Sequence, residues 1–200
     1  MRQGSMSKSK PIILASASPR RRELLALTGL KFRIDAGDYE EDLGLKLKPH
    51  DLAKHLSREK ARSVAQKYYD ALIIAADTFI VFRDKLLGKP HTDKEAVRML
   101  AMLNGKSHAV ITGYTVLNAA TGKYISRAVE TTVWFKKVSP AGIRAYVKTK
   151  EPLDKAGAYA IQGLGSLMVK EIQGDYFNVI GLPLSSLADT LKKFGISLLA

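Results

Sequence analysis

The stretch Pro11-Ile12-Ile13-Leu14-Ala15-Ser16-Ala17-Ser18-Pro19-Arg20-Arg21-Arg22-Glu23-Leu24-Leu25 joins a short apolar run to a polar segment. It predicts a buried strand followed by a helix over Pro19–Leu27, because Ser18 suits the N-cap and the fixed φ of Pro19 suits the first helical turn. The arginines of that turn lie at the positive end of the helix dipole, where each cation destabilises the helix by about 0.3–1 kcal/mol. Such a terminus suits a bound anion, most commonly phosphate, although the arginines could also simply extend into solvent.

The composition is that of a soluble globular protein, and 200 residues suit one large domain or two closely packed lobes. Cysteine is absent, which excludes disulfides, thiolate metal sites and cysteine nucleophiles. No apolar run reaches the roughly 18 residues of a membrane span, and there is no signal-peptide pattern. We therefore expect a cytoplasmic protein with no membrane partner. We interpret residues 1–5 as an expression-tag remnant and residues 6–200 as a single two-lobed domain.

The formal net charge of +13 has two interpretations. A basic surface can bind nucleic acid, or it can serve an enzyme whose substrate is a small polyphosphate. Aromatic residues make up 8% of the chain and do not interleave with basic runs, so no stacking platform for single strands is indicated. Nucleic acid is therefore the less favoured partner.

Two acidic positions stand out along the chain. The loop Gly37-Asp38-Tyr39-Glu40-Glu41-Asp42 is either a solvated turn or a source of a ligand for a divalent metal. The apolar run Ala71–Ala76 predicts a buried strand that leads directly into Asp77 and Thr78. A buried carboxylate is costly unless it is paired, hydrogen-bonded or bound to metal. Asp77 is therefore either satisfied by neighbouring N–H groups or is a catalytic or metal-binding acid.

Helical and strand patterns alternate through the rest of the chain, which indicates the α/β class. Pro49–Tyr69 predicts a long amphipathic helix that carries Lys60, and Gly88-Lys89-Pro90 presents a lysine on a constrained loop. The segment 151–163 predicts a loop that carries Asp154, Lys155 and Gln162, and loops of this kind often hold binding sites. Residues 166–175 predict a hairpin with its turn at Gln173-Gly174-Asp175.

Five motifs of the chain resemble those of the Maf family in order and spacing. They are Ser16-x-Ser18-Pro19-Arg20-Arg21-x-Glu23-Leu24-Leu25, Ala76-Asp77-Thr78, Gly88-Lys89-Pro90, Asp154-Lys155-Ala156-Gly157-x-Tyr159-x-Ile161-Gln162-Gly163 and Gly174-Asp175-Tyr176-x-Asn178-Val179-x-Gly181-Leu182-Pro183. The family consists of house-cleaning nucleoside triphosphate pyrophosphatases, also called septum formation inhibitors. The resemblance implies a two-lobed α/β fold like that of the inosine triphosphate pyrophosphatases, with an elongated curved mixed sheet and a central cleft.

The resemblance also implies hydrolysis of a nucleoside triphosphate to a monophosphate and pyrophosphate, with a divalent metal ion (Mg²⁺, Mn²⁺ or Co²⁺) as cofactor. Arg20, Thr78 and Gln162 match the subfamily that acts on dTTP and UTP, whereas the subfamily that prefers 7-methyl-GTP typically has Asp-Gln in place of Asp77-Thr78. Modified pyrimidine triphosphates remain alternative substrates. Homodimers are common in the family, and the sequence leaves the oligomeric state open.

The motifs and the resemblance together predict one site. Asp77 is either the general base toward the attacking water or a metal ligand, and Glu41 is the second candidate ligand. Gln162 and Thr78 are expected to recognise the pyrimidine by hydrogen bonds. The residues predicted to hold the triphosphate are Ser16, Arg20, Arg21, Lys60 and Lys89. The rival hypothesis is a basic nucleic-acid-binding regulator of septation without catalysis.

Overall fold

A computed structural model of the chain describes residues 10–39 and 44–199. The strands are β1 (Ile12–Ala15), β2 (Phe32–Ile34), β3 (Leu72–Phe82), β4 (Lys85–Leu87), β5 (Ser107–Asn118), β6 (Tyr124–Phe135) and β7 (Val169–Gln173). The α-helices are α1 (Pro19–Ala26), α2 (Pro49–Ala65), α3 (Asp93–Leu103), α4 (Pro140–Lys148), α5 (Tyr176–Ile180) and α6 (Leu184–Lys192). Three short 3-10 turns cover Glu151–Asp154, Ala156–Ala158 and Gly163–Met168.

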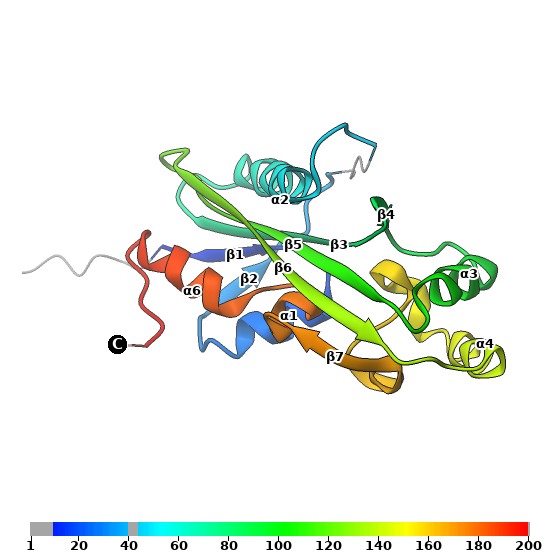
Figure 1. Cartoon of the computed structure of the whole chain (residues 1–200). Helices are drawn as coiled ribbons and strands as arrows, with labels where there is room; N and C mark the ends of the chain where they lie inside the picture. The colour runs from blue at the N-terminus through cyan, green and yellow to red at the C-terminus, as the bar shows by residue number, and fades with distance from the viewer. Residues whose placement is uncertain (1–9, 40–43, 200) are drawn as a thin grey trace, which may run out of the picture.

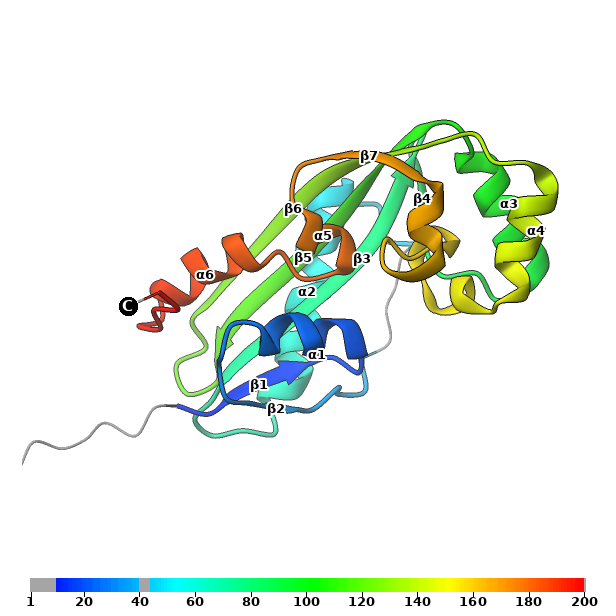
Figure 2. The same ribbon diagram turned by 90° about the horizontal axis from the view of Figure 1, so that it is seen from below.

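The described strands form one mixed seven-stranded sheet in the order β2-β1-β3-β5-β6-β7, with β4 also paired to β3. β1 is parallel to both β2 and β3, whereas β3, β5, β6 and β7 pair antiparallel in turn. The long strands β3, β5 and β6 run from one end of the molecule to the other (Figure 2). The α/β class with a mixed sheet flanked by helices is therefore confirmed.

Both faces of the sheet are covered because the inner strands are apolar on both sides, as buried strands of this kind are. Ile13, Ile73 and Ala75 pack with α2 on one face. Leu14, Ile74 and Ala76 face the opposite side, where side chains of α1, α5 and α6 join the same cluster. Figure 1 shows α2 above the sheet and α1 and α6 below it.

A separate apolar cluster fills the far end of the sheet. There α3 and α4 pack on the ends of β3, β5 and β6, with Leu100, Leu103, Val133 and Ile143 among the buried side chains. This end lies away from β1 and β2 (Figure 2). The division into two lobes stays a prediction.

The predicted hairpin after residue 166 is wrong in its second half. β7 pairs with β6, and the chain then enters the short helix α5 instead of a returning strand. Asp175 causes the change, because its side chain caps α5 by accepting hydrogen bonds from the N–H groups of Phe177 and Asn178. In the described ranges, no helix combines the length and apolar character needed to cross a membrane.

Candidate active site

The site lies where one edge of β3 has no strand beside it in the described structure. β1 pairs with β3 as far as Ala75, and β4 pairs with the same strand from Ile80 onward. Residues 76–79 lie between these two partners, just beyond the carboxyl end of β1. Ligands of open α/β sheets typically bind outside the carboxyl ends of parallel strands, where chain connections diverge.

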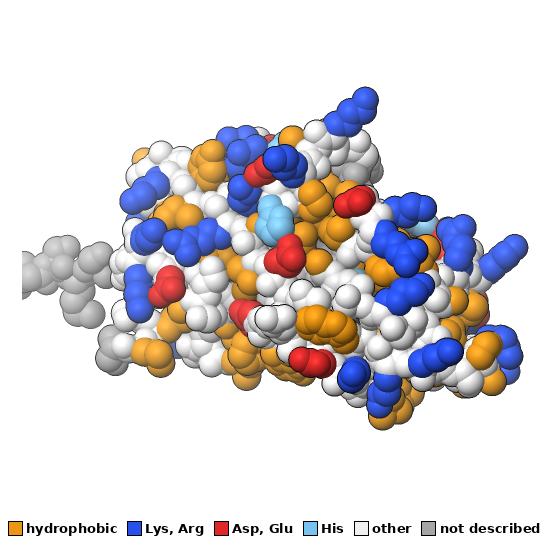
Figure 3. All heavy atoms as spheres, in the orientation of Figure 1, with side chains coloured by type: hydrophobic (Ala, Val, Ile, Leu, Met, Phe, Trp, Pro, Cys, Tyr) orange, Lys and Arg blue, Asp and Glu red, His pale blue; other side chains and the backbone are white. Residues whose placement is uncertain are grey.

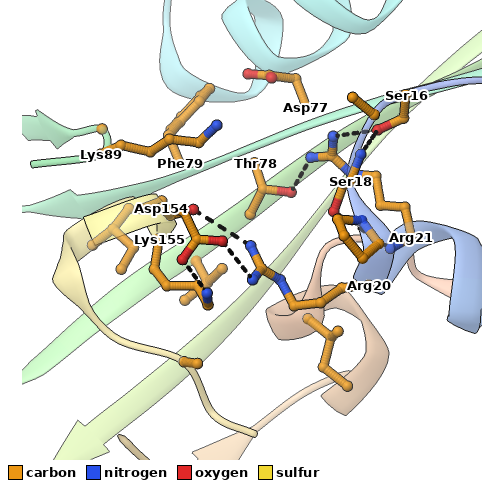
Figure 4. Close-up of a pocket in the computed structure, with 18 of the residues that line it drawn as sticks. Ser16, Ser18, Arg20, Arg21, Asp77, Thr78, Phe79, Lys89, Asp154 and Lys155 are labelled. Atoms are coloured by element: carbon orange, nitrogen blue, oxygen red, sulfur yellow. Dashed lines mark hydrogen bonds and ion pairs between the residues drawn. The ribbon is translucent and has the colours of Figure 1, made fainter. Parts of the chain in front are cut away.

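Asp77 and Thr78 occupy this open edge and point to opposite faces, because successive side chains of a strand alternate. Asp77 lies on the face covered by α2, with Ile73 and Ala75. Thr78 lies on the face of α1. Figure 4 shows the Asp77 carboxylate directed toward α2 and the Thr78 hydroxyl directed toward Arg21. A ligand in the gap therefore meets functional groups from both faces.

On the α2 face, the buried carboxylate is paired with a lysine. Asp77 is 4% exposed, and its Oδ1 lies 2.5 Å from Lys60 Nζ. The Lys60 side chain is itself only 12% exposed. A buried ion pair contributes little to stability, because desolvation offsets the attraction between the charges. Its position at the open edge is therefore better explained by chemistry than by folding.

On the α1 face, Arg21 is held by three elements at once. Its Nε donates to the Gly181 carbonyl at 2.9 Å, Nη1 to Ser16 Oγ at 3.3 Å and Nη2 to Thr78 Oγ1 at 3.1 Å. Thr78 Oγ1 also lies 2.9 Å from Thr112 Oγ1 in the neighbouring strand. The guanidinium is consequently fixed in place before any ligand arrives, which lowers the entropy lost on binding.

Arg20 points the other way, toward the loop after α4. Its Nη1 lies 3.3 Å from Asp154 Oδ2, and Lys155 also pairs with that carboxylate (Figure 4). Burial raises the pKa of Asp154, but the Lys155 hydrogen bond and the charges of Lys155 and Arg20 outweigh it and hold the pKa below its ordinary value. Asp154 therefore stays ionised near neutral pH and joins the α1 N-terminus to the opposite end of the molecule.

These groups line one cavity of about 860 Å³. This volume lies within the usual range for small-molecule sites. Lys89 and Gln162 complete the wall. Among the described lining residues, Lys and Arg side chains outnumber carboxylates: the former are Arg20, Arg21, Lys60, Lys89 and Lys155, and the latter are Asp77, Glu95 and Asp154. The cavity is thus suited to a polyanion of nucleotide size.

Comparisons with known proteins support this description. The family model of Maf-like proteins matches residues 11–194. A Methanosarcina barkeri protein is 50% identical over 190 residues, which cover 94% of this chain and 96% of that protein. Proteins of Desulforamulus reducens (94% and 99% covered) and Moorella thermoacetica (92% and 95% covered) are each 48% identical. All three carry the name dTTP/UTP pyrophosphatase. The chain belongs to the Maf-like protein family.

In this Maf-like protein, the structure brings together the described residues that the sequence predicted. The cavity lining includes Ser16, Arg20, Arg21, Lys60, Asp77, Thr78, Lys89 and Gln162. Glu41, the second predicted metal ligand, lies outside the described residues. The roles assigned to these side chains stay predictions, because their grouping alone does not test them.

Sequence reasoning noted Asp154 and Lys155 within a loop but assigned them no place in the site. Both line the cavity, and Asp154 pairs with Arg20 across it. Their position in the Asp-Lys-Ala-Gly motif was the available signal. Glu95 and His91 also line the cavity, next to the start of α3. Nothing in the pattern of that helix distinguished them from solvated surface.

The described residues are compatible with the metal expected from the family, but they do not form a complete metal site by themselves. Within the described ranges, no three His, Cys, Asp or Glu side chains gather as a metal site. Mg²⁺, however, is usually held by one or two carboxylates together with substrate phosphates. Asp77 supplies one such carboxylate at the open edge. The donor set therefore suits a metal that enters with the nucleotide.

Proposed function

We propose that this Maf-like protein hydrolyses dTTP and UTP to the nucleoside monophosphate and pyrophosphate. The observation that carries the proposal is the open edge of β3, where a buried carboxylate meets a cavity lined mainly by cations. The names of the relatives, at 48–50% identity over nearly the whole chain, indicate the same reaction and substrates.

Asp77 is the proposed reactive group. As a general base it takes a proton from the water that attacks the α-phosphorus, while the bond to the departing pyrophosphate breaks. Lys60 Nζ, 2.5 Å from this carboxylate, holds the group in place. The alternative role, in which Asp77 holds a metal, uses the same orientation. A bound divalent metal would neutralise phosphate charge and lower the pKa of its water, with Asp77 and Glu41 as its proposed ligands.

The triphosphate is proposed to lie along the cationic wall. Arg21 is fixed beside Ser16 at the α1 N-terminus, and Arg20 and Lys89 line the same cavity. Preorganised cations of this kind stabilise the charge that develops on the leaving pyrophosphate. Phosphate binding at Arg20 would compete with its present partner Asp154.

The pyrimidine is proposed to be read by Gln162 and Thr78. A site built to hydrogen-bond a base rejects analogues that leave its buried groups unpaired. Thr78 already bonds Arg21 and Thr112, so the free amide of Gln162 is the more direct candidate for contact with the base. The link to septum formation, the cytoplasmic location and a homodimeric state stay predictions.

The deciding experiment is a nucleotide panel assayed for phosphate with and without added inorganic pyrophosphatase. We expect dTTP and UTP to yield phosphate only when pyrophosphatase is present, in a reaction that requires a divalent metal. Direct release of orthophosphate would indicate a phosphatase instead. Preference for 7-methyl-GTP or for a modified pyrimidine triphosphate would reassign the substrate. A salt-dependent shift of duplex DNA, with no hydrolysis, would favour the nucleic-acid-binding hypothesis.

A further inference from the structure

The backbone on one side of Gln162 is held by a tyrosine that lies outside the cavity. Tyr146, on α4, is 7% exposed, and its hydroxyl oxygen accepts a hydrogen bond from the Ala160 N–H at 3.2 Å. The same hydroxyl donates to Glu151 Oε1 at 2.8 Å. Tyr146 therefore connects the start of the loop to a carboxylate.

That carboxylate holds the other side of the same loop. Glu151 Oε2 accepts from the Leu164 N–H at 3.1 Å, and Oε1 accepts from the Gly165 N–H at 3.0 Å. A carboxylate that accepts backbone N–H groups forms stronger hydrogen bonds than a neutral acceptor. Gln162 is thus bracketed, two residues before and two or three residues after, by bonds to a single Tyr146–Glu151 pair.

The shape of the loop is adapted to this pair. A Cβ at Gly165 would lie 2.2 Å from the Ala160 carbonyl oxygen and 2.6 Å from the Tyr146 hydroxyl. A Cβ at Gly163, which has φ of +78°, would lie 2.8 Å from Glu151 Oε2. Both glycines are needed for the backbone to close around the two side chains.

Tyr146 and Glu151 do not line the cavity, whereas Ala160 and Gln162 do. Any influence on substrate must therefore pass through the loop. We infer that Tyr146 and Glu151 are positioning residues that fix the Gln162 amide against the nucleobase and thereby set the preference among pyrimidine triphosphates. The inference rests on the proposed pyrophosphatase function.

The test compares UTP with CTP, whose bases differ in their hydrogen-bonding edge. Glu151→Gln keeps the side-chain size but replaces one acceptor oxygen with a donor facing a backbone N–H. We expect the ratio of kcat/KM for UTP to kcat/KM for CTP to fall about tenfold, the effect of weakening roughly one hydrogen bond to the base. Tyr146→Phe should lower the ratio in the same direction. Glu171→Gln, at an exposed position of β7, is the matched control and should leave the ratio unchanged.

A double-mutant cycle separates positioning from general support of the fold. In a Gln162→Ala background, Glu151→Gln should not change the ratio further, because the amide that it positions is gone. Equal losses for both nucleotides, or a ratio change that adds to that of Gln162→Ala, would overturn the inference. If Glu151→Gln fails to fold, Tyr146→Phe is carried through the same cycle.

Amide hydrogen exchange gives a readout independent of activity. Exchange at Leu164 and Gly165 should accelerate in Glu151→Gln while the strands of the sheet keep their protection. A wild-type protein that hydrolyses neither dTTP nor UTP would refute the proposed function. Unchanged exchange in Glu151→Gln would refute the proposal that Glu151 holds the loop. An active wild type with faster exchange and an unchanged UTP-to-CTP ratio would refute the role in base preference alone.

Discussion

At the scale of single residues, Asp77 carries the largest prediction. It is buried at the open edge of β3 with Lys60 as its ion-pair partner. Asp77→Asn keeps the shape but removes the base, and also the negative charge that a metal would need. We expect pyrophosphate release to fall at least about 100-fold, the usual contribution of a positioned acid or base.

The matched control for this variant is Asp84→Asn, at the exposed turn between β3 and β4. This substitution removes the same charge from the same hairpin, outside the residues that line the cavity. Its turnover should match the wild type. Circular dichroism should confirm that Asp77→Asn is folded. Turnover of the folded variant near that of the wild type would contradict the role assigned to Asp77.

His108 predicts a pH dependence of stability. It is 4% exposed, its Nε2 lies 2.8 Å from the Tyr159 hydroxyl, and burial lowers its pKa from 6.5 to about 4. The unfolded chain therefore binds a proton between pH 6.5 and 4 that the folded protein does not bind. The contribution of the neutral His108 side chain to folding stability is complete above pH 6.5 and is lost as the pH falls toward 4. At about pH 5 we expect about 2 kcal/mol less stability against urea than at about pH 7.5.

His108→Phe should flatten this slope, since it removes the titrating group from the pocket formed by Phe135 and Tyr159. The comparison is the change in unfolding free energy between the two pH values, not the absolute stability of the variant. His91→Gln, at an exposed position, is the control and should keep the slope of the wild type. An unchanged slope in His108→Phe would show that other groups control the acid sensitivity.

At the scale of elements, the approach of α2 to the sheet depends on one glycine. Gly113 of β5 pairs with Asp77 of β3, and a Cβ at this position would lie 2.0 Å from the Ala53 carbonyl oxygen of α2. Gly113→Ala must therefore push the helix outward. We expect a loss of about 1–3 kcal/mol in unfolding free energy, typical of overpacking. Because α2 carries Lys60, kcat should fall as well.

Full activity in a destabilised Gly113→Ala would separate helix placement from catalysis and contradict this prediction. Unfolding free energy and kcat should be measured on the same preparation. Ala120→Ser, at the exposed turn between β5 and β6, tests whether any small change near this strand has the same effect. It should leave both quantities unchanged.

Most elements could be predicted because their local signals were strong. Ser18 caps α1, and the apolar run before Asp77 forms the centre of β3. Tyr176–Ile180 was missed because a five-residue helix shows too little periodicity, and its decisive cap, Asp175, is as common in turns as in helices. The 3-10 turns around Gln162 depend on Tyr146 and Glu151, which approach from other segments and leave no local pattern.

At the scale of the whole molecule, the cavity joins segments far apart in the chain. Arg20 meets Asp154 across 134 positions, and Arg21 meets Thr78 across 57. The order of the family motifs predicts that these residues share one site. It does not predict which of their side chains are in contact. The Lys60–Asp77 ion pair is the clearest contact that the sequence could not predict. Lys60 lies in a polar part of a helical pattern, and nothing in that pattern indicates that it pairs with a buried carboxylate.

The net charge of +13 also acts at this scale. Figure 3 shows Lys and Arg side chains at both ends of the face it displays. Asp and Glu side chains are fewer than Lys and Arg side chains on this face. A protein with this excess attracts a nucleoside triphosphate before contact, and salt screens such long-range attraction. Raising sodium chloride from about 0.05 M to about 0.5 M, where the Debye length falls severalfold, should lower kcat/KM for UTP several-fold. It should change kcat little, because the groups around Asp77 are buried and less screened.

Sucrose at matched osmolarity is the control for this experiment, since it leaves the electrostatic attraction intact. It should leave kcat/KM nearly constant apart from the effect of viscosity on diffusion. If salt lowers kcat and kcat/KM together, the screening acts on bound charges such as the Arg20–Asp154 pair, which is partly exposed at the cavity wall. A kcat/KM that does not respond to salt would mean that the basic surface contributes nothing to substrate capture, and that the cations of the cavity alone determine binding.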